Sequence, residues 1–545
     1  MNRDFIVSGK LVDIVSRRVF NARIKVANQK IVLIEEVEQE FNQYIIPGLV
    51  DAHVHIESSM VVPTSFAREA VKHGTVATVS DPHEIANVMG VEGVHYMVNN
   101  GKKTPFKFYF GAPSCVPATP FETSGAVIDA EQIRCLMDNE DIYYLAEMMN
   151  FPGVIYNDQE VHKKIEHARK SGKPIDGHAP GLSGDGLSKY ASQNISTDHE
   201  CTTVEEAFKK IEKGIKIQIR EGSAAKNFEK LFPLISSHPD QIMFCTDDCH
   251  PDDLQKGHIN KIMSRAIKKG ADLFDVITAA TKNPKEHYKL KTGLLQLNDP
   301  ADIVVVNNLE DFDVLQTYIN GQLIFNKGEV LIKKTKEKPI NKFLCNPIDV
   351  SDLKVEWQGA KIQVIVAKDG DLLTGSDKLK PSVVNNEVIS DVSRDILKIA
   401  VINRYQDSKP QVGFIKNFNL KKGAIAGSIA HDSHNIIAIG VSDEDIVAAV
   451  NAIIENKGGI AAVDDNGLKA LKLNVAGLMS LDEVSEVAKK YQEVHQMAKE
   501  LGSKLTAPFM TMAFMALLVI PELKIGDQGL FDVSKFEFTS LFVDS

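Results

Sequence analysis

The alternation of two patterns between residues 47 and 290 constrains the fold most. Short apolar runs typical of buried strands are followed by helix-like stretches, such as residues 65–73, 158–171 and 204–213. This alternation indicates parallel βα units. A closed (β/α)8 barrel usually takes about 250 residues, so we predict that fold for residues 47–290. The eight candidate strands end near His55, Asp81, Pro113, Glu147, His178, His199, Glu221 and Asp247.

The segments on either side of this alternation differ from it. Residues 1–46 and 291–332 carry short strand-like bursts, and we expect them to form one small β-sandwich domain. Residues 333–342 are charged and lack apolar periodicity, which predicts a linker. Residues 343–545 mix strand and helix patterns, so we predict an additional α+β domain. One of its helices is expected from about residue 481, because Ser480 and Glu483 have capping-box spacing.

Composition excludes several classes of function. The 545 residues include 62 basic and 73 acidic side chains, a net charge of −11, whereas a protein that coats nucleic acid usually concentrates positive charge. The most apolar segment, residues 509–518, is shorter than the ~20 residues that span a bilayer, so we expect buried core there and no membrane partner. The N-terminus lacks the apolar stretch of a signal peptide, and six cysteines do not make a disulfide framework. Both features favour a cytoplasmic protein.

Polar residues recur where the predicted strands end, which is where barrel enzymes build their sites. His53 and His55 are two residues apart, so on a strand both imidazoles face the same way and could bind one divalent ion. Glu147 stands in an apolar run, and a buried carboxylate needs a partner. Either a metal or a basic residue inside the barrel would satisfy it.

Three further donors, His178, His199 and Asp247, end other predicted strands. Together with the three residues above they make six nitrogen and oxygen ligands, too many for one tetrahedral zinc with an open position. Such a set fits two metals that share a bridging carboxylate and a bridging hydroxide. Ligands of these types suit manganese, iron or zinc alike. The glycine pairs form no phosphate-binding fingerprint, so we expect no nucleotide cofactor.

Several motifs resemble those of one family. The sequence PGLVDAHVH at residues 47–55 is similar to the first-strand signature of the amidohydrolase superfamily, and DPADIVV at residues 299–305 resembles its return into the small β domain. Longer motifs narrow the resemblance to the adenine deaminase family of bacteria and archaea. They stand at residues 55–60, 81–88, 112–117, 177–181 and 246–253, and the resemblance extends over nearly the whole chain.

The resemblance implies a metal-dependent hydrolase barrel that deaminates adenine to hypoxanthine and ammonia in purine salvage. It also implies two divalent cations, Mn²⁺ first, with Fe²⁺ or Zn²⁺ as alternatives. Asp247 would accept a proton from the attacking water and pass it to the departing amine. Matched by motif, the ligands divide into a set for each cation and a bridge: His53, His55 and Asp247; His178 and His199; and Glu147.

The remaining candidate residues have less definite roles. Glu84 or His83, after the second strand, would protonate a ring nitrogen or hold the purine edge, although a structural carboxylate explains Glu84 almost as well. We assign substrate contacts to Asp248, Glu221 and Ser114.

Two short segments allow two interpretations each. Residues 220–223 either line the purine pocket or form an ion pair at the barrel rim. Residues 430–435, AHDSHN, are interpreted first as a turn between two strands. The alternative is that they reach into the barrel mouth or bind another ion.

Two other functions compete with adenine deamination. One is the hydrolysis of another cyclic amide or amidine, as by a hydantoinase or a cytosine deaminase; glutamate rather than lysine at position 147 argues against the cyclic amide hydrolases. The other is a catalytically inactive metal-binding protein, which would be free to lose some of the ligands. We further expect a homodimer.

Overall fold

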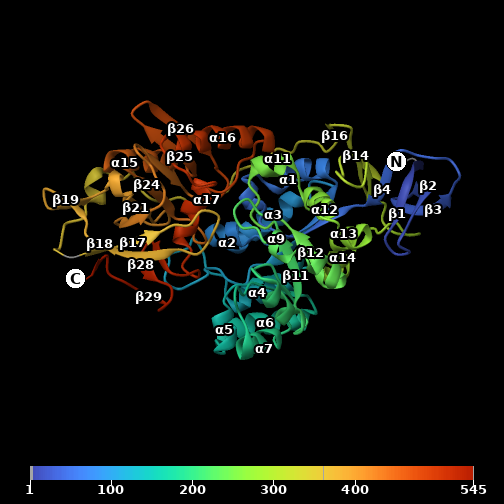
Figure 1. Cartoon of the computed structure of the whole chain (residues 1–545), viewed down its shortest axis with the longest axis horizontal. Helices are drawn as coiled ribbons and strands as arrows, with labels where there is room; N and C mark the ends of the chain where they lie inside the picture. The colour runs from blue at the N-terminus through green and yellow to red at the C-terminus, as the bar shows by residue number, and fades with distance from the viewer. Residues whose placement is uncertain (1–3, 360, 544–545) are drawn as a thin grey trace.

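The computed structural model (Figure 1) describes residues 4–359 and 361–543. Its barrel domain is a closed ring of parallel strands. The ring consists of two sheets, β5 to β9 and β10 to β12, each in chain order. Isolated parallel bridges, Ile175 to Ile195 and Val54 to Asp247, join their edges. The predicted (β/α)8 barrel is therefore confirmed. Its strands are β5 (Leu49–Val54), β6 (Thr75–Ser80), β7 (Lys107–Ala112), β8 (Ile142–Met148), β9 (Ile175–Gly177), β10 (Thr197–Asp198), β11 (Lys216–Arg220) and β12 (Ile242–Cys245).

Side-chain caps and one buried apolar face define the helices that follow the strands. Asp158 accepts a hydrogen bond from the Val161 amide at the start of α6, and Thr203 does the same for Glu206 at the start of α8. Their apolar faces are buried against the barrel. The main barrel helices are α1 (Pro63–Ala70), α2 (His83–Met89), α3 (Val91–Gly101), α4 (Ala130–Met137), α6 (Gln159–Ser171), α7 (Gly184–Ala191), α8 (Val204–Ile211), α11 (Pro251–Lys256), α12 (Ile259–Lys268), α13 (Leu273–Ala279) and α14 (Lys282–Tyr288).

The two flanking strand blocks share one sheet. β4 (Tyr44–Pro47) from the first block pairs antiparallel with β13 (Ile303–Val306) from the second. Where we predicted a β-sandwich, the two blocks form one continuous eight-stranded sheet with its own apolar core. Its other strands are β1 (Phe5–Asp13), β2 (Arg18–Ala27), β3 (Lys30–Glu36), β14 (Val314–Ile319), β15 (Gln322–Asn326) and β16 (Glu329–Val330).

The C-terminal domain lies on the side of the barrel away from the N-terminal sheet, as Figure 1 shows. Its large sheet has the order β18-β17-β22-β21-β24-β23-β25-β26 and is covered by α15 (Asp443–Asn456) and α16 (Val484–Glu500). The apolar residues 508–516, which form α17 (Pro508–Ala513) and a 3-10 turn, are buried as predicted. The strands are β17 (Lys361–Val366), β18 (Gly375–Leu379), β21 (Leu397–Ile402), β22 (Gln411–Lys416), β23 (Ala424–Gly427), β24 (Ile436–Gly440), β25 (Gly459–Asp464) and β26 (Gly467–Lys472).

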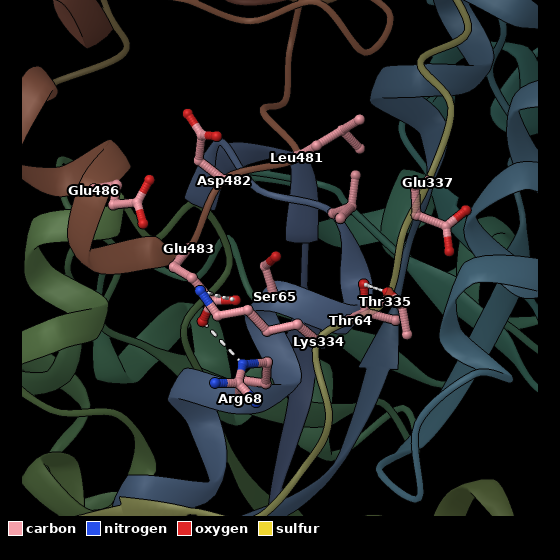
Figure 2. A pocket seen from close by; sticks show the side chains of 11 residues that line it. Thr64, Ser65, Arg68, Lys334, Thr335, Glu337, Leu481, Asp482, Glu483 and Glu486 are labelled. Atoms are coloured by element: carbon pink, nitrogen blue, oxygen red, sulfur yellow. Dashed lines mark hydrogen bonds and ion pairs between the residues drawn. The ribbon is translucent and has the colours of Figure 1, made fainter.

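A polar seam joins the C-terminal domain to the barrel, and Figure 2 shows it from close by. Arg68 of α1 donates to the Glu483 carboxylate at 2.9 Å. The Ser480 amide donates to the Met60 carbonyl, so the chain is still extended at Ser480. The predicted capping box is therefore wrong: α16 begins at Val484, and Glu483 makes no side-chain cap bond.

Among the helices that the structure describes, none combines the length and the apolarity needed to cross a membrane.

Candidate active site

The C-terminal ends of the barrel strands bring the six predicted ligands together. His53 and His55 at the end of β5 point their Nε2 atoms toward each other at 3.3 Å. Glu147 of β8 lies beside them, with Oε1 3.2 Å from His55 Nε2. The other three residues, contributed after β9, β10 and β12, are His178, His199 and Asp247, and all contact this group.

Glu147 divides the cluster into two halves. Its Oε1 faces the imidazole of His55, whereas its Oε2 lies 2.7 Å from His178 Nδ1 and 3.3 Å from His199 Nε2. Burial raises the pKa of Glu147, but the imidazoles of His178 and His199 outweigh it and hold the pKa well below its ordinary value. The side chain is thus an ionised carboxylate with one oxygen aimed at each half.

Asp247 is fixed from both sides. Its Oδ1 lies 3.4 Å from His53 Nε2 and 3.2 Å from His55 Nε2, while Oδ2 accepts a hydrogen bond from Arg220 Nη1 at 2.7 Å. Burial raises the pKa of Asp247, but Arg220 and the two imidazoles lower it well below the usual range. The positive φ of 55° at Asp247 turns the chain at the end of β12 and aims this carboxylate into the barrel mouth.

The donor set fits divalent cations. Nitrogen ligands 2.0–2.1 Å from one tetrahedral ion lie about 3.4 Å from each other, which is close to the 3.3 Å between the ring nitrogens of His53 and His55. Three-residue groups whose donor atoms lie within 4.8 Å of one another occur on both sides of Glu147: His53, His55 and Asp247 on one side, and His178, His199 and Glu200 on the other. Burying so many ionisable groups in one place is costly unless a cation pairs with the carboxylates.

Arg220 forms a buried ion pair with Glu200, a residue to which sequence reasoning gave no role. Arg220 Nη2 donates to Glu200 Oε2 at 3.1 Å, and Nη1 contacts the other oxygen as well as Asp247. Glu200 Oε1 lies 3.4 Å from His199 Nε2. Of the two interpretations of residues 220–223, the structure supports an ion pair for Arg220, but one turned into the barrel mouth rather than out from the rim.

Asp51 supports the cluster from behind. Its Oδ1 accepts the amides of Thr246 at 3.1 Å and His53 at 3.3 Å, and its Oδ2 accepts the Thr246 hydroxyl at 2.5 Å. His258 Nε2 lies 3.0 Å from the same Oδ2, and its Nδ1 bonds Thr75 Oγ1. Asp51 thereby ties the first barrel strand to the last one, immediately beside His53 and Asp247.

Glu84 and His83 lie at the mouth, where residues 430–435 of the C-terminal domain reach them. His83 Nδ1 is 3.4 Å from Glu147 Oε1, and its Nε2 is 3.5 Å from Glu84 Oε1. Both Glu84 oxygens contact histidines of the C-terminal domain, His431 and His434. The favoured interpretation of residues 430–435 as a turn between β23 and β24 is correct locally, but it omits this contact with the barrel mouth.

The three residues predicted to contact the substrate lie in three different environments. The Asp248 carboxylate accepts the Ser58 hydroxyl at 2.5 Å, and burial, with the charge of Asp247, raises its pKa. The Ser114 hydroxyl donates to the Glu147 carbonyl at 2.6 Å, so it supports a ligand strand. Glu221 pairs with Arg265 at 2.5 Å instead of contacting the cluster.

The chain matches two family models. Residues 44–324 match the model described as "Amidohydrolase family", and residues 371–537 match "Adenine deaminase C-terminal domain". The first match covers the barrel with the ligand cluster and defines the class of protein.

The relatives cover the whole chain. An adenine deaminase of Methanosarcina mazei is 56% identical over 98% of this chain and 99% of its own length. Those of Borreliella burgdorferi and Salinibacter ruber are 49% and 48% identical, over 98% and 100% of this chain and 99% and 100% of their own lengths. Within the amidohydrolase class, the chain therefore belongs to the adenine deaminase family.

Proposed function

We propose that the chain hydrolyses adenine to hypoxanthine and ammonia at the mouth of its barrel. The proposal rests on one observation above all: Glu147 stands between two sets of buried nitrogen and oxygen ligands within a chain of the adenine deaminase family. We assign His53, His55 and Asp247 to the first cation and His178 and His199 to the second, with Glu147 between them. Mn²⁺ is our first choice, with Fe²⁺ or Zn²⁺ as alternatives.

The residues of the chain supply proton transfer and orientation. Cations held by the cluster would lower the pKa of a bound water from 15.7 to about 7 and so provide a nucleophile at neutral pH. Asp247, kept ionised by Arg220, would accept the proton that the attacking water loses as the water oxygen bonds to C6 of adenine. The same carboxylate returns the proton to the exocyclic nitrogen, the C6–N bond breaks, and ammonia leaves.

Protonation of the ring is the second requirement. Electron density moves onto the ring nitrogen beside C6 during the attack, and a proton or a hydrogen bond must stabilise it. We assign the donation to His83, which lies at the mouth close to Glu147, and His83 regains a proton from the C6 hydroxyl as the carbonyl of hypoxanthine forms. Glu84 is a carboxylate in contact with His431 and His434, so we assign it the hydrogen bond that an N–H group of the purine edge donates. Asp248 is our candidate for a further contact with the purine, whereas Glu221 is withdrawn from that role because it is paired with Arg265.

The setting of the enzyme follows from the same proposal. Adenine conversion to hypoxanthine belongs to purine salvage, and we place it in the cytoplasm. A homodimer remains our expectation for the assembly, with adenine as the small-molecule partner and no role for nucleic acid.

A comparison of three substrates tests the proposal. The purified chain, with its metal content measured by elemental analysis, is assayed for turnover of adenine, cytosine and dihydrouracil. We expect ammonia and hypoxanthine from adenine at a rate at least 100-fold above the other two. Preferential ammonia release from cytosine or ring opening of dihydrouracil would identify another cyclic hydrolase, and inactivity with bound metal would indicate a binding protein.

A further inference from the structure

The turn between β23 and β24 carries two histidines from the C-terminal domain into the barrel mouth. His431 Nδ1 lies 2.9 Å from Glu84 Oε1, and His434 Nε2 contacts Glu84 Oε2. Each carboxylate oxygen of Glu84 therefore has its own imidazole partner, 347 and 350 positions away in the sequence. All three side chains are at least 93% buried, so water does not compete for these contacts.

The hydrogen bonds define how His434 holds Glu84. His434 Nδ1 accepts the Ala430 amide at 3.4 Å, which leaves the ring proton on Nε2. That proton is donated to Glu84 Oε2. A neutral imidazole fixed in this tautomer orients a carboxylate without needing to change its own charge, as second-shell partners do elsewhere.

The turn itself is held rigidly. Tyr405 donates its hydroxyl to the Ser433 carbonyl at 2.5 Å, and the Asn435 side chain accepts the Arg404 amide at 3.1 Å. His431 stacks on Phe514 with ring centroids 4.8 Å apart. His434 has a φ of 55°, a left-handed conformation that a histidine keeps only where its surroundings determine it.

Residues of the C-terminal domain also form hydrogen bonds with the barrel loop beside the mouth. Asn435 Nδ2 donates to the Thr123 carbonyl at 3.0 Å, and the Asp527 carboxylate accepts the Thr123 amide at 2.9 Å. Residues of the C-terminal domain thus hold both Glu84 and the loop that follows β7.

We propose that His431 and His434 are positioning residues, through which the C-terminal domain completes the active site by fixing the Glu84 carboxylate against the purine. This inference rests on the proposed function, because fixing Glu84 affects turnover only if Glu84 acts on adenine. It gives the C-terminal domain a role in the chemistry. Loss of either histidine frees one carboxylate oxygen, so Glu84 rotates away from the orientation in which it accepts an N–H group of the purine edge.

A double-mutant cycle tests the proposal. We expect Glu84→Gln to lower kcat by about 100-fold or more, and His434→Ala to lower kcat at least about tenfold, with KM changed less than threefold and metal content unchanged. His434→Gln, whose amide can still donate, is expected to recover part of the loss. In the Glu84→Gln background His434→Ala should have no further effect, because both changes remove the same function. His495→Gln on α16 is the matched control and should behave as wild type.

The possible outcomes distinguish failure of the positioning role from failure of the proposed function. If the wild-type chain turns over adenine and the His434→Ala variant is fully active, the positioning role is overturned. The role is also overturned if His434→Ala lowers kcat equally in the wild-type and in the Glu84→Gln background. Failure of the wild-type chain to deaminate adenine overturns the proposed function itself. Thermal unfolding identifies a folding defect, in which case His431→Asn and His434→Gln, which keep a polar side chain, decide between the same two outcomes.

Discussion

Replacing Asp51 with alanine removes the buried carboxylate that joins the first barrel strand to the last. The carboxylate is fully buried and accepts three hydrogen bonds, two from Thr246 and one from the His53 amide. Both amides belong to buried residues, so the change leaves each of them without its acceptor. Both the stability of the barrel and the aim of Asp247, the next residue after Thr246, therefore depend on Asp51.

The magnitude follows from these bonds. Each buried donor left without an acceptor costs about 1–3 kcal/mol, so the two amides together predict a loss of about 2–6 kcal/mol in the free energy of unfolding. Displacement of a ligand-supporting contact typically costs 10- to 100-fold in activity or metal affinity. We expect kcat per folded molecule to fall within that range, since His53 and Asp247 both shift.

Urea unfolding and steady-state deamination of adenine measure the two effects separately. Thr75→Val is the matched control: it removes one neutral hydrogen bond of the same network, to His258, and should cost about 1 kcal/mol with little change in kcat. An Asp51→Ala variant that is within 1 kcal/mol of wild type would refute the energetic reasoning. A large loss of stability with unchanged kcat would refute the link from Asp51 to the ligands.

Three further predictions concern other parts of the chain. Glu147→Gln should reduce metal content, measured by elemental analysis, below two ions per chain and lower kcat by at least about 100-fold, because one half of the cluster loses its oxygen. Gly177→Ala should cost about 1–3 kcal/mol in urea unfolding, since its Cβ would lie 2.4 Å from the Thr197 carbonyl oxygen; unchanged stability would contradict this. Burial lowers the pKa of Lys524 to about 7, so above that pH the native state lacks a proton that the unfolded chain binds up to its ordinary pKa of 10.5. Wild-type stability should therefore rise with pH between 7.5 and 9 by roughly 1 kcal/mol per unit more than that of Lys524→Met; parallel pH profiles would be evidence against it.

The barrel and its polar strand ends could be predicted from the sequence because both signals are local. A parallel strand buried on two faces is a short apolar run, and its C-terminal end is marked by the first polar residue that follows. His55, Glu147 and Asp247 all stand at such ends. Closure of the ring then brings them together, whatever the details of the helices.

The remaining site residues depend on contacts between distant segments. Asp51 lies inside an apolar strand, and its partner Thr246 is 195 positions away, so the sequence offers no sign of their pairing. His431 and His434 meet Glu84 only because the C-terminal domain folds over the barrel mouth. A sequence such as AHDSHN forms a turn between strands more often than it enters a site, so the sequence alone favours a turn.

Packing also overrode one local signal. Ser480 and Glu483 have capping-box spacing, yet the Ser480 amide bonds Met60 of the barrel and its carbonyl accepts the Val62 amide. This bridge keeps the chain extended through Ser480. Glu483 accepts a hydrogen bond from Arg68 instead of capping the helix. The apolar face of α16 depends on burial rather than on the cap, and it is buried from Val484, where the helix begins, along the rest of the helix.

Titration of the metal-free enzyme with Mn²⁺, followed by ammonia release from adenine, tests the central claim most directly. If the six ligands hold two cations that act together, activity should rise until two equivalents per chain have been added and then remain constant. Full activity with no metal, or saturation at a single equivalent, would contradict a centre divided by Glu147.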